Sequence, residues 1–288
     1  MLHAIWALLL AFFASAGVPT AKPWQQVPSP PPMPAPLESG YANVNGIRMY
    51  YAIFGHGSPI LLIPLGEGNA DQWSGEIPLL SRHHTIIVAD TRGHGRSTWD
   101  GRPLSYRLMA SDYLALLDQL HFRKVALAGV SDGAIIGLQI AIDHPERLTK
   151  LFAQGANATP DAAYAKAADP AASKAASALN ADEYRSLSPT PNDFAQFHAA
   201  MNRMWSAEPK FSSAQLAAIR TPTAIVMSDH DEWIPPEHAR YLAETIPNAR
   251  LIVLHNVSHY AALQAPRMYA KAILSFVDSV QRNSKKRS

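Results

Sequence analysis

The segment Gly129-Val130-Ser131-Asp132-Gly133 places a serine between two glycines, directly after an apolar run and before a helix-like segment. A serine at such a strand–turn–helix junction sits on a tight, strained turn that projects its hydroxyl above the edge of a sheet. The following helix would direct N–H groups and its positive dipole end toward a developing oxyanion. The pattern predicts Ser131 as a nucleophile. The alternative is an ordinary glycine-flanked turn with Ser131 as a helix N-cap.

A serine hydroxyl needs a general base, and the base needs an acid to orient it. His259 follows the apolar run 250–255 and precedes the last helix-like segment, at the same edge of the predicted sheet as Ser131. His255 ends that run, where we expect a structural role, and His238 falls in a helix pattern, where we expect it to be solvated. We therefore predict His259 as the base.

The acid should follow the preceding apolar run, residues 224–228, where the loop reads Asp229-His230-Asp231-Glu232. Asp231 lies far enough past the strand for the loop to swing back toward a histidine, and we predict it as the acid. Asp229 is the rival and Glu232 a weaker one. A solvated acidic loop without a catalytic role is the alternative reading.

Two backbone N–H groups are predicted to form an oxyanion hole. One belongs to Asp132, directly after the nucleophile, and the other to Gly66 in the loop Leu65-Gly66-Glu67-Gly68, with Leu65 as its alternative. The Asp132 carboxylate could pair with a cationic substrate group such as the ammonium of an amino ester. It could instead only complement the helix dipole. The residues predicted to contact substrate are Leu65, Asp132, Met201, Trp205 and Tyr260.

Alternating strand-like and helix-like segments are predicted to position these groups. A hairpin is expected over 43–54, with its turn at Asn45-Gly46. Short apolar runs predict buried strands at 59–64, 84–90, 124–130, 148–154, 224–228 and 250–255. Helix-like patterns cover 70–80, 105–120, 134–144, 236–246 and 261–281. This alternation predicts an α/β fold with a mostly parallel sheet covered by helices on both faces.

Residues 158–219 interrupt this alternation. They lack a buried-strand run, are rich in alanine, and carry Phe194, Phe197, Met201, Met204 and Trp205 at helix-like spacing. We predict a small helical cap, inserted into a core made of residues 39–157 and 220–282. The apolar cap residues either pack the cap onto the core or face a substrate cleft, and the sequence leaves both open.

Both ends of the chain differ in composition from the core. Residues 4–13 are uniformly apolar and small residues follow, so residues 1–21 predict a secretory signal peptide cleaved after Ala16 or Ala21. A short membrane anchor is the alternative, but spanning a bilayer takes about 20 apolar residues. We expect an exported protein, periplasmic or secreted. Residues 22–38 predict an extended, poorly packed proline-rich linker, and residues 283–288 a solvated basic tail.

Composition excludes several classes of function. The formal charge is +2, from 25 basic and 23 acidic side chains, which gives no reason to expect nucleic acid as a partner. The chain has no cysteine, which excludes disulfides, thiolate metal sites and a cysteine nucleophile. The predicted chemistry needs no metal and no cofactor. The expected partner is a small-molecule substrate, without stable membrane insertion, and the oligomeric state is left open.

From about residue 41 onward the sequence resembles the α/β-hydrolase superfamily. The resemblance rests on the glycine-rich loop after residues 59–64 with Trp73 downstream, on residues 90–97 (DTRGHGRS), and on the GVSDG, SDHD and NVSH segments. GVSDG followed by Gly155-Ala156-Asn157 is similar to the branch of valacyclovir-hydrolase-like small-ester hydrolases. The sequence departs from the family at Pro64-Leu65, where many members have His-Gly, and at Ser228, where glycine is common.

The resemblance implies hydrolysis of a small ester through an acyl-enzyme intermediate. It also implies that residues 92–97 shape the cleft floor and that His94 is not catalytic. A serine nucleophile argues against dehalogenase or epoxide-hydrolase chemistry, whose enzymes on this fold carry an aspartate there. Lactones, thioesters, amides, carbon–carbon bonds and perhydrolysis remain open. The alternative of another class is a non-catalytic binding protein that retained the fold.

Overall fold

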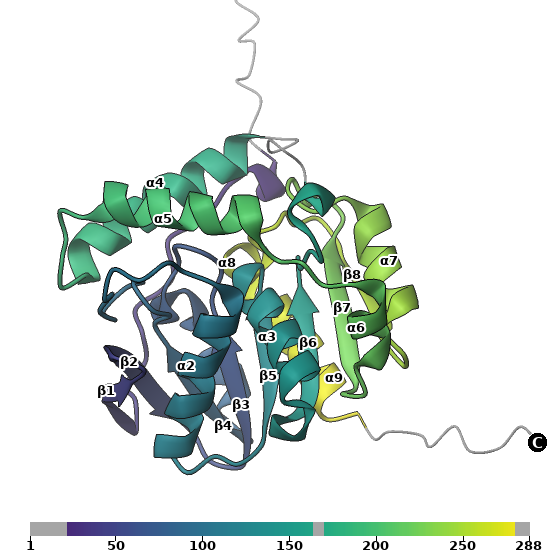
Figure 1. Cartoon of the computed structure of the whole chain (residues 1–288), viewed down its shortest axis with the longest axis horizontal. Coiled ribbons are helices and arrows are strands. Elements are labelled where there is room, and N and C mark those ends of the chain that lie inside the picture. Colours follow the sequence, from purple (N-terminus) through teal and green to yellow (C-terminus); the bar gives the residue numbers. More distant parts are fainter. Residues whose placement is uncertain (1–21, 164–169, 280–288) are drawn as a thin grey trace, which may run out of the picture.

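A single eight-stranded sheet forms the centre of the molecule, with the strand order β1-β2-β4-β3-β5-β6-β7-β8 (Figure 1). The computed structural model describes residues 22–163 and 170–279, so the predicted signal peptide (1–21) and basic tail (283–288) lie outside the described residues. β1 and β2 run antiparallel, and the strands from β3 onward are parallel. The mostly parallel sheet confirms the predicted fold class. The strands are β1 Glu38–Val44, β2 Ile47–Phe54, β3 Ser58–Ile63, β4 His84–Ala89, β5 Val125–Val130, β6 Leu148–Gln154, β7 Thr223–Ser228 and β8 Arg250–Leu254.

Helices cover both faces of this sheet, as apolar strands require. One hydrophobic cluster joins α2, α3, α6 and α7 to one face, and a second joins α1, α8 and α9 to the other. None of the helices within the described ranges is long and apolar enough to cross a membrane. The α-helices are α1 Ile77–Leu80, α2 Tyr106–Gln119, α3 Asp132–Asp143, α4 Pro170–Leu187, α5 Phe194–Ala207, α6 Ser213–Ala218, α7 Pro236–Thr245, α8 Ala261–Gln264 and α9 Pro266–Val277.

Two predicted helices are each divided in the structure. The segment predicted over 261–281 forms α8 and α9, which meet at Pro266, because proline lacks the N–H that a continuous helix needs. The segment predicted over 70–80 forms a short 3-10 helix, Ala70–Trp73, followed by α1. Gly75 lies between them, and a Cβ there would come within 2.6 Å of Pro266 Cβ. The glycine therefore allows two divided segments to pack closely.

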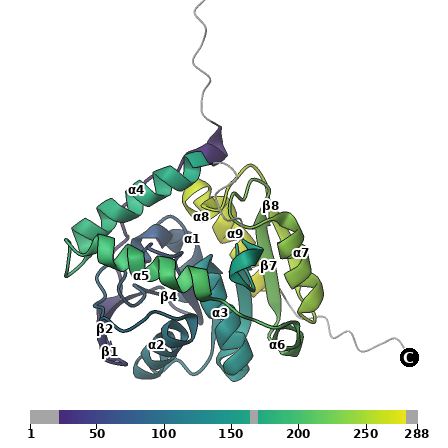
Figure 2. The ribbon, with the colours of Figure 1, turned by 45° about the horizontal axis from the view of Figure 1, so that its top comes forward.

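Within residues 158–219, α4 and α5 lie across one edge of the sheet (Figures 1 and 2). Tyr184 of α4 and Phe197 of α5 stack with ring centroids 5.3 Å apart, and His94 contacts Phe197 edge-on at 4.8 Å. The side chain of Phe197 is fully buried. Aromatic contacts therefore join the two helices to each other and to the loop after β4.

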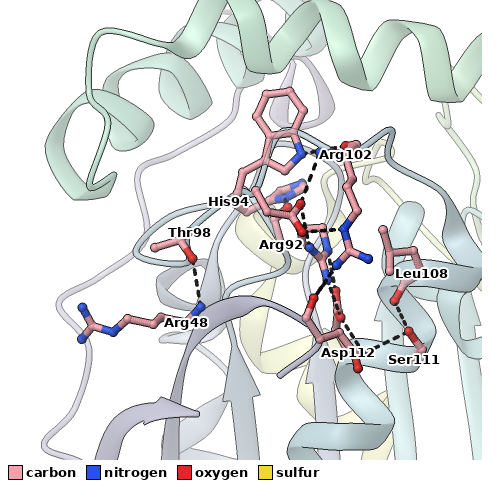
Figure 3. Close-up of polar contacts among 11 residues, drawn as sticks. Arg48, Arg92, His94, Thr98, Arg102, Leu108, Ser111 and Asp112 are labelled. Carbon is pink, nitrogen blue, oxygen red and sulfur yellow. Dashed lines mark hydrogen bonds and ion pairs between the residues drawn. The ribbon is translucent and has the colours of Figure 1, made fainter. Parts of the chain in front are cut away.

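The loop after β4 is anchored by a buried arginine (Figure 3). Arg92 donates from Nε and Nη2 to the Asp112 carboxylate at 2.8 and 2.7 Å, and lies 3.0 Å from Asp100. Both Arg92 and Asp112 are fully buried, so each charge depends on the other for compensation. His94 Nδ1 lies 2.9 Å from the Arg92 carbonyl oxygen, and burial lowers the pKa of His94 to about 4. These contacts give the loop a structural role.

The proline-rich segment is more ordered than the sequence indicates. It has no strand or α-helix between residues 26 and 36, in keeping with an extended chain. However, Trp24 stacks on His230, and Ser74 Oγ donates to the Pro31 carbonyl at 2.6 Å. Trp24 and Ser74 thus give the segment contacts with the core, although none of residues 22–38 is buried. Consecutive prolines indicate extended backbone, but the pattern does not reveal that the backbone carbonyls will find donors on the core.

Candidate active site

Ser131 lies at the junction of β5 and α3 in a strained backbone conformation, with φ 53° and ψ −117°. A non-glycine residue with these angles is held there by its surroundings. A Cβ at Gly129 would come within 2.3 Å of the Gly133 carbonyl, and one at Gly133 within 2.3 Å of the Ile63 carbonyl oxygen. Only glycine fits at either position. The two glycines of the motif are therefore explained by close passage of chain against chain.

His259 and Asp231 meet above the ends of β7 and β8. His259 Nδ1 lies 3.0 and 3.1 Å from the two carboxylate oxygens of Asp231. Asp231 Oδ1 also accepts the backbone N–H groups of Trp233 and Ile234, at 3.0 and 2.9 Å. The carboxylate is therefore fixed by its own loop before it reaches the imidazole. This geometry matches the orientation that a base receives from an acid in a serine-hydrolase triad.

The charge state of His259 depends on its surroundings. Burial disfavours the imidazolium, since the residue is only 4% exposed. The Asp231 carboxylate, assisted by Glu232 and Asp132, outweighs burial and holds the pKa of His259 above its ordinary value. Stabilisation of the imidazolium is what a general base needs when it takes a proton from an alcohol.

The other acidic and histidine candidates have different partners. Asp229 accepts the Asn256 N–H at 3.1 Å and pairs with His255 at 3.2 Å, away from His259. Glu232 accepts the backbone N–H of His259 at 2.9 Å, so it supports the base loop but does not contact the imidazole through this bond. His238 is not solvated as predicted, because its Nε2 accepts the Ala158 N–H at 3.0 Å.

A cavity of about 530 Å³ opens beside these groups and is lined by both Ser131 and His259. The cap contributes two polar stripes to its wall. Ser173, Ser177 and Asn180 come from α4, and His198, Asn202 and Ser206 come from α5. The spacing of each stripe corresponds to one face of a helix. Further lining residues are Leu65, Gly66, Glu67, Tyr106, Asp132, Asn157, Pro160, Ala163, Trp205, Glu208, Trp233, Ile234 and Tyr260.

The predicted oxyanion residues lie together at the wall of this cavity. Asp132 is the first residue of α3, and the first N–H groups of a helix have no partner within it. Gly66 faces Asp132 so closely that a Cβ at Gly66 would come within 2.5 Å of Asp132 Oδ2 and 2.7 Å of the Trp205 ring. A side chain at position 66 would therefore enter the space where Ser131, Gly66 and Asp132 meet.

The Asp132 carboxylate is held by two side chains that the sequence reasoning did not pair with it. The Tyr106 hydroxyl donates to Oδ1 at 2.8 Å, and Trp205 Nε1 donates to Oδ2 at 2.9 Å. Burial raises the pKa of Asp132 to about 6, against the opposing effect of these hydrogen bonds. A second acidic group, Glu67, pairs with His198 at 2.5 Å. Burial raises the pKa of Glu67 too.

Four of the five predicted substrate contacts line the cavity: Leu65, Asp132, Trp205 and Tyr260. Met201 is not among the lining residues. It is fully buried and packs in the hydrophobic cluster that joins α5 to the core. The apolar stripe of α5 covers the core, while the neighbouring stripe with Trp205 faces the cavity. Tyr106, Glu67, His198 and Trp233 line the cavity without having been predicted, and no sequence signal marks them.

Comparisons with known proteins agree with this architecture. The chain is 28% identical over 246 residues to RutD of Pseudomonas savastanoi pv. phaseolicola, whose name assigns it to carbamate hydrolysis, covering 77% of this chain and 95% of that protein. It is 27% identical over 256 residues to the mouse serine hydrolase BPHL, covering 84% of this chain and 87% of that protein. An enol-lactonase from Burkholderia xenovorans LB400 superposes with a TM-score of 0.67 at 23% identity, covering 83% of this chain and all of that chain, which shows a shared fold.

The family assignment rests on a match to a family model over half of the chain. Residues 58–205, from β3 to α5, match the family described as alpha/beta hydrolase fold. That stretch includes the Ser131 turn, the loop at residues 65–68, α4, and α5 as far as residue 205. Together with the relatives above, it makes the protein a hydrolase. The chain belongs to the α/β-hydrolase family.

Proposed function

We propose that this protein is a serine hydrolase that cleaves a small carboxylic ester through an acyl-enzyme intermediate. Ser131 is the nucleophile, His259 the general base and Asp231 the acid that orients it. One observation carries the proposal: a serine on a strained turn opens into the same cavity as a buried histidine bonded to a carboxylate. The name of the mouse relative, a serine hydrolase, supports the same assignment.

The proposed reaction has two halves. His259 Nε2 takes the proton of Ser131 Oγ as that oxygen bonds to the carbonyl carbon, and the N–H groups of Asp132 and Gly66 stabilise the oxyanion. The ester C–O bond breaks, and the alcohol leaves with the proton from His259. A water molecule then loses a proton to His259 as it attacks the acyl carbon. The bond between the acyl carbon and Ser131 Oγ breaks, His259 returns that proton to Oγ, and the acid is released. Asp231 holds the imidazole in the tautomer with its proton on Nδ1.

The residues that line the cavity favour a substrate that is small, polar and positively charged. Its lining carries the carboxyl groups of Glu67, Asp132 and Glu208, and no lysine or arginine is among its described lining residues. An ammonium group near Asp132 would favour the ionised carboxylate, whose formation burial otherwise penalises. We therefore propose amino esters as preferred substrates. The polar stripes of α4 and α5 also make the wall unsuited to a long alkyl chain.

Replacing Ser131 with alanine tests the reaction. We expect Ser131→Ala to lose hydrolysis of p-nitrophenyl esters and labelling by a fluorophosphonate probe, with its thermal unfolding unchanged. Esterase activity retained in that variant would overturn the proposal. A substrate panel then defines the bond: amino-acid esters, neutral esters of increasing acyl length, lactones, amides and a carbamate. A carbamate is included because of the name of RutD.

We further propose that the enzyme acts outside the cytoplasm, on the basis of the apolar run at residues 4–13 and the small residues after it. Both predicted cleavage positions, after Ala16 and after Ala21, precede the described part of the chain. The mass of the protein recovered from the periplasm or medium tests this directly. A full-length mass in the cytoplasmic fraction would contradict it.

A further inference from the structure

We propose that residues 22–27, here called the strap, position the acid and the base of the active site by bridging the two loops that carry them. The strap lies outside the cavity, beside α8 and one end of α4, and appears in purple in Figures 1 and 2. The inference rests on the proposed triad. It assigns a role to a segment whose composition indicates only a linker.

On the acid loop, the strap contacts the residue directly before Asp231. The Trp24 and His230 rings stack with centroids 3.7 Å apart and an interplanar angle of 7°. Lys22 Nζ lies 5.2 Å from the Trp24 ring centroid. The backbone N–H of His230 donates to the Val257 carbonyl at 3.2 Å, so the stacked residue also joins the acid loop to the base loop.

On the base loop, the strap is connected through Gln264 of α8. Gln264 Nε2 lies 2.8 Å from the Gln26 carbonyl oxygen and 3.2 Å from that of Trp24. The same side chain accepts the backbone N–H of Ser258, directly before His259, at 2.8 Å. One glutamine therefore connects two strap carbonyls to the residue next to the catalytic histidine.

Further along, Val27 extends these contacts toward the cavity. It packs against a small cluster of Tyr260 and the α4 residues Ala172 and Ala176, against which Leu65 also packs. Tyr260 and Leu65 both line the cavity. The strap therefore contacts the acid loop, the base loop and the cap within a few residues.

These contacts matter because the acid and the base come from two separate strand ends. Asp231 follows β7 and His259 follows β8, so their 3.0 Å contact depends on the relative position of two loops. A misplacement of about 1 Å at a catalytic group can reduce turnover by about 100-fold. A third segment that contacts both loops limits such misplacement. Trp24 and Gln264 are therefore positioning residues, since neither touches the reacting atoms.

The test compares four variants of the full chain with the wild type. Trp24→Ala removes the stack and Trp24→Phe retains an aromatic ring. Gln264→Ala removes the connection to Ser258. Leu37→Ser is the matched control, because Leu37 belongs to the same N-terminal segment but is 60% exposed. The measurements are kcat and KM on an ester substrate across pH, the thermal midpoint, and the titration of His259 followed by NMR of its Cε1–H group.

We expect Trp24→Ala and Gln264→Ala to lower kcat by about tenfold with little change in KM, since orientation and not the substrate contacts is lost. The charged groups that act on the His259 imidazole are Asp231, Glu232 and Asp132, and the Tyr260 ring packs edge-on against it with centroids 5.7 Å apart. Loosening of the Asp231 contact should lower the pKa of His259 and move the acidic limb of kcat/KM to lower pH. Trp24→Phe should restore most of the activity, and Leu37→Ser should resemble the wild type.

Either of two results would overturn the proposal. One is kcat within twofold of the wild type in both Trp24→Ala and Gln264→Ala. The other is a loss of kcat in them without any shift of the acidic limb or of the His259 titration, which would indicate a general loss of stability. Failure of the proposed function is distinguishable, because it would appear as wild-type protein without turnover dependent on Ser131. The His259 titration would still report on the strap in that case.

Discussion

Replacement of Asp231 by asparagine should change which nitrogen of His259 carries the proton. In the structure Asp231 Oδ1 accepts the N–H groups of Trp233 and Ile234, at 3.0 and 2.9 Å. An asparagine must keep an oxygen at that position, because an amide NH₂ cannot accept those bonds. Its Nδ2 therefore takes the place of Oδ2, which lies 3.1 Å from His259 Nδ1. Oδ1 also lies 3.0 Å from Nδ1, but an Nδ1–H would point at the new amide N–H groups as well. We therefore expect Nδ2 to donate to Nδ1 and the imidazole proton to move to Nε2.

An imidazole with its proton on Nε2 cannot accept the proton of Ser131. In serine proteases the corresponding change reduces kcat by about 10⁴-fold, or about 5.4 kcal/mol of activation free energy. We expect a loss of 10³- to 10⁴-fold in Asp231→Asn, on the order of 4 to 5.4 kcal/mol. The fold should be retained, because the side chain keeps its volume and its two backbone acceptor bonds.

Asp229→Asn is the matched control, since Asp229 belongs to the same loop and pairs with the exposed His255. We expect its kcat to stay within about threefold of the wild type. Steady-state and pre-steady-state kinetics with p-nitrophenyl acetate would measure acylation in both variants. If Asp229→Asn lost as much activity as Asp231→Asn, or if Asp231→Asn lost less than tenfold, the acid would be misassigned.

Two further predictions concern groups around the triad. Gly155→Ala should lower kcat at least tenfold, because a Cβ there would come within 2.7 Å of His259 Cε1 and the position has φ +64°. Steady-state kinetics together with a thermal melt would check this, and an unchanged kcat would contradict it. Asp132→Asn should affect the free energy of unfolding more favourably at pH 8 than at pH 4, by up to about 3 kcal/mol. The reason is that the pKa of Asp132, about 6, lies above the ordinary 3.8. Because the folded pKa is raised, the ionised carboxylate destabilises the fold increasingly as the pH rises from about 4 through 6. Urea unfolding at both pH values measures the difference, and a pH-independent effect would refute it.

Much of the fold follows from local pattern. The strands from β3 onward are short apolar runs, and the structure has them within about a residue of the predicted ends, as in β5. The expectation of burial is wrong for 250–255: β8 is the last strand of the sheet order, only Leu254 in it is buried, and Leu251 and Val253 are 39% and 38% exposed. The hairpin turn at Asn45-Gly46 is also confirmed, since both residues have the positive φ that this turn requires. The divided helix at Pro266 was missed although the proline was visible, because apolar periodicity continues across it.

Site residues could be predicted where a short sequence motif marks them, but contacts between side chains from distant elements could not. Ser131 could be found from two flanking glycines, whose absence of side chains is a steric requirement at one turn. The partners of Asp132 could not, because Tyr106 begins α2 and Trp205 belongs to α5. The prediction that Met201 lines the substrate cavity was wrong for a related reason. Periodicity identifies the apolar face of a helix, but it does not show whether the cavity beside that helix is polar.

The position of Asp132 links the stability of this protein to its proposed specificity. A carboxyl group that is 6% exposed destabilises the native state whenever it is ionised, so an apolar or amide side chain would serve the fold better. Tyr106 and Trp205 reduce that penalty without removing it, and both donors approach from the cavity wall. A cationic ligand would offset the remainder by adding a favourable charge interaction to the ionised form. We therefore propose that the energetic cost of this buried acid beside the nucleophile is offset by a cationic substrate group.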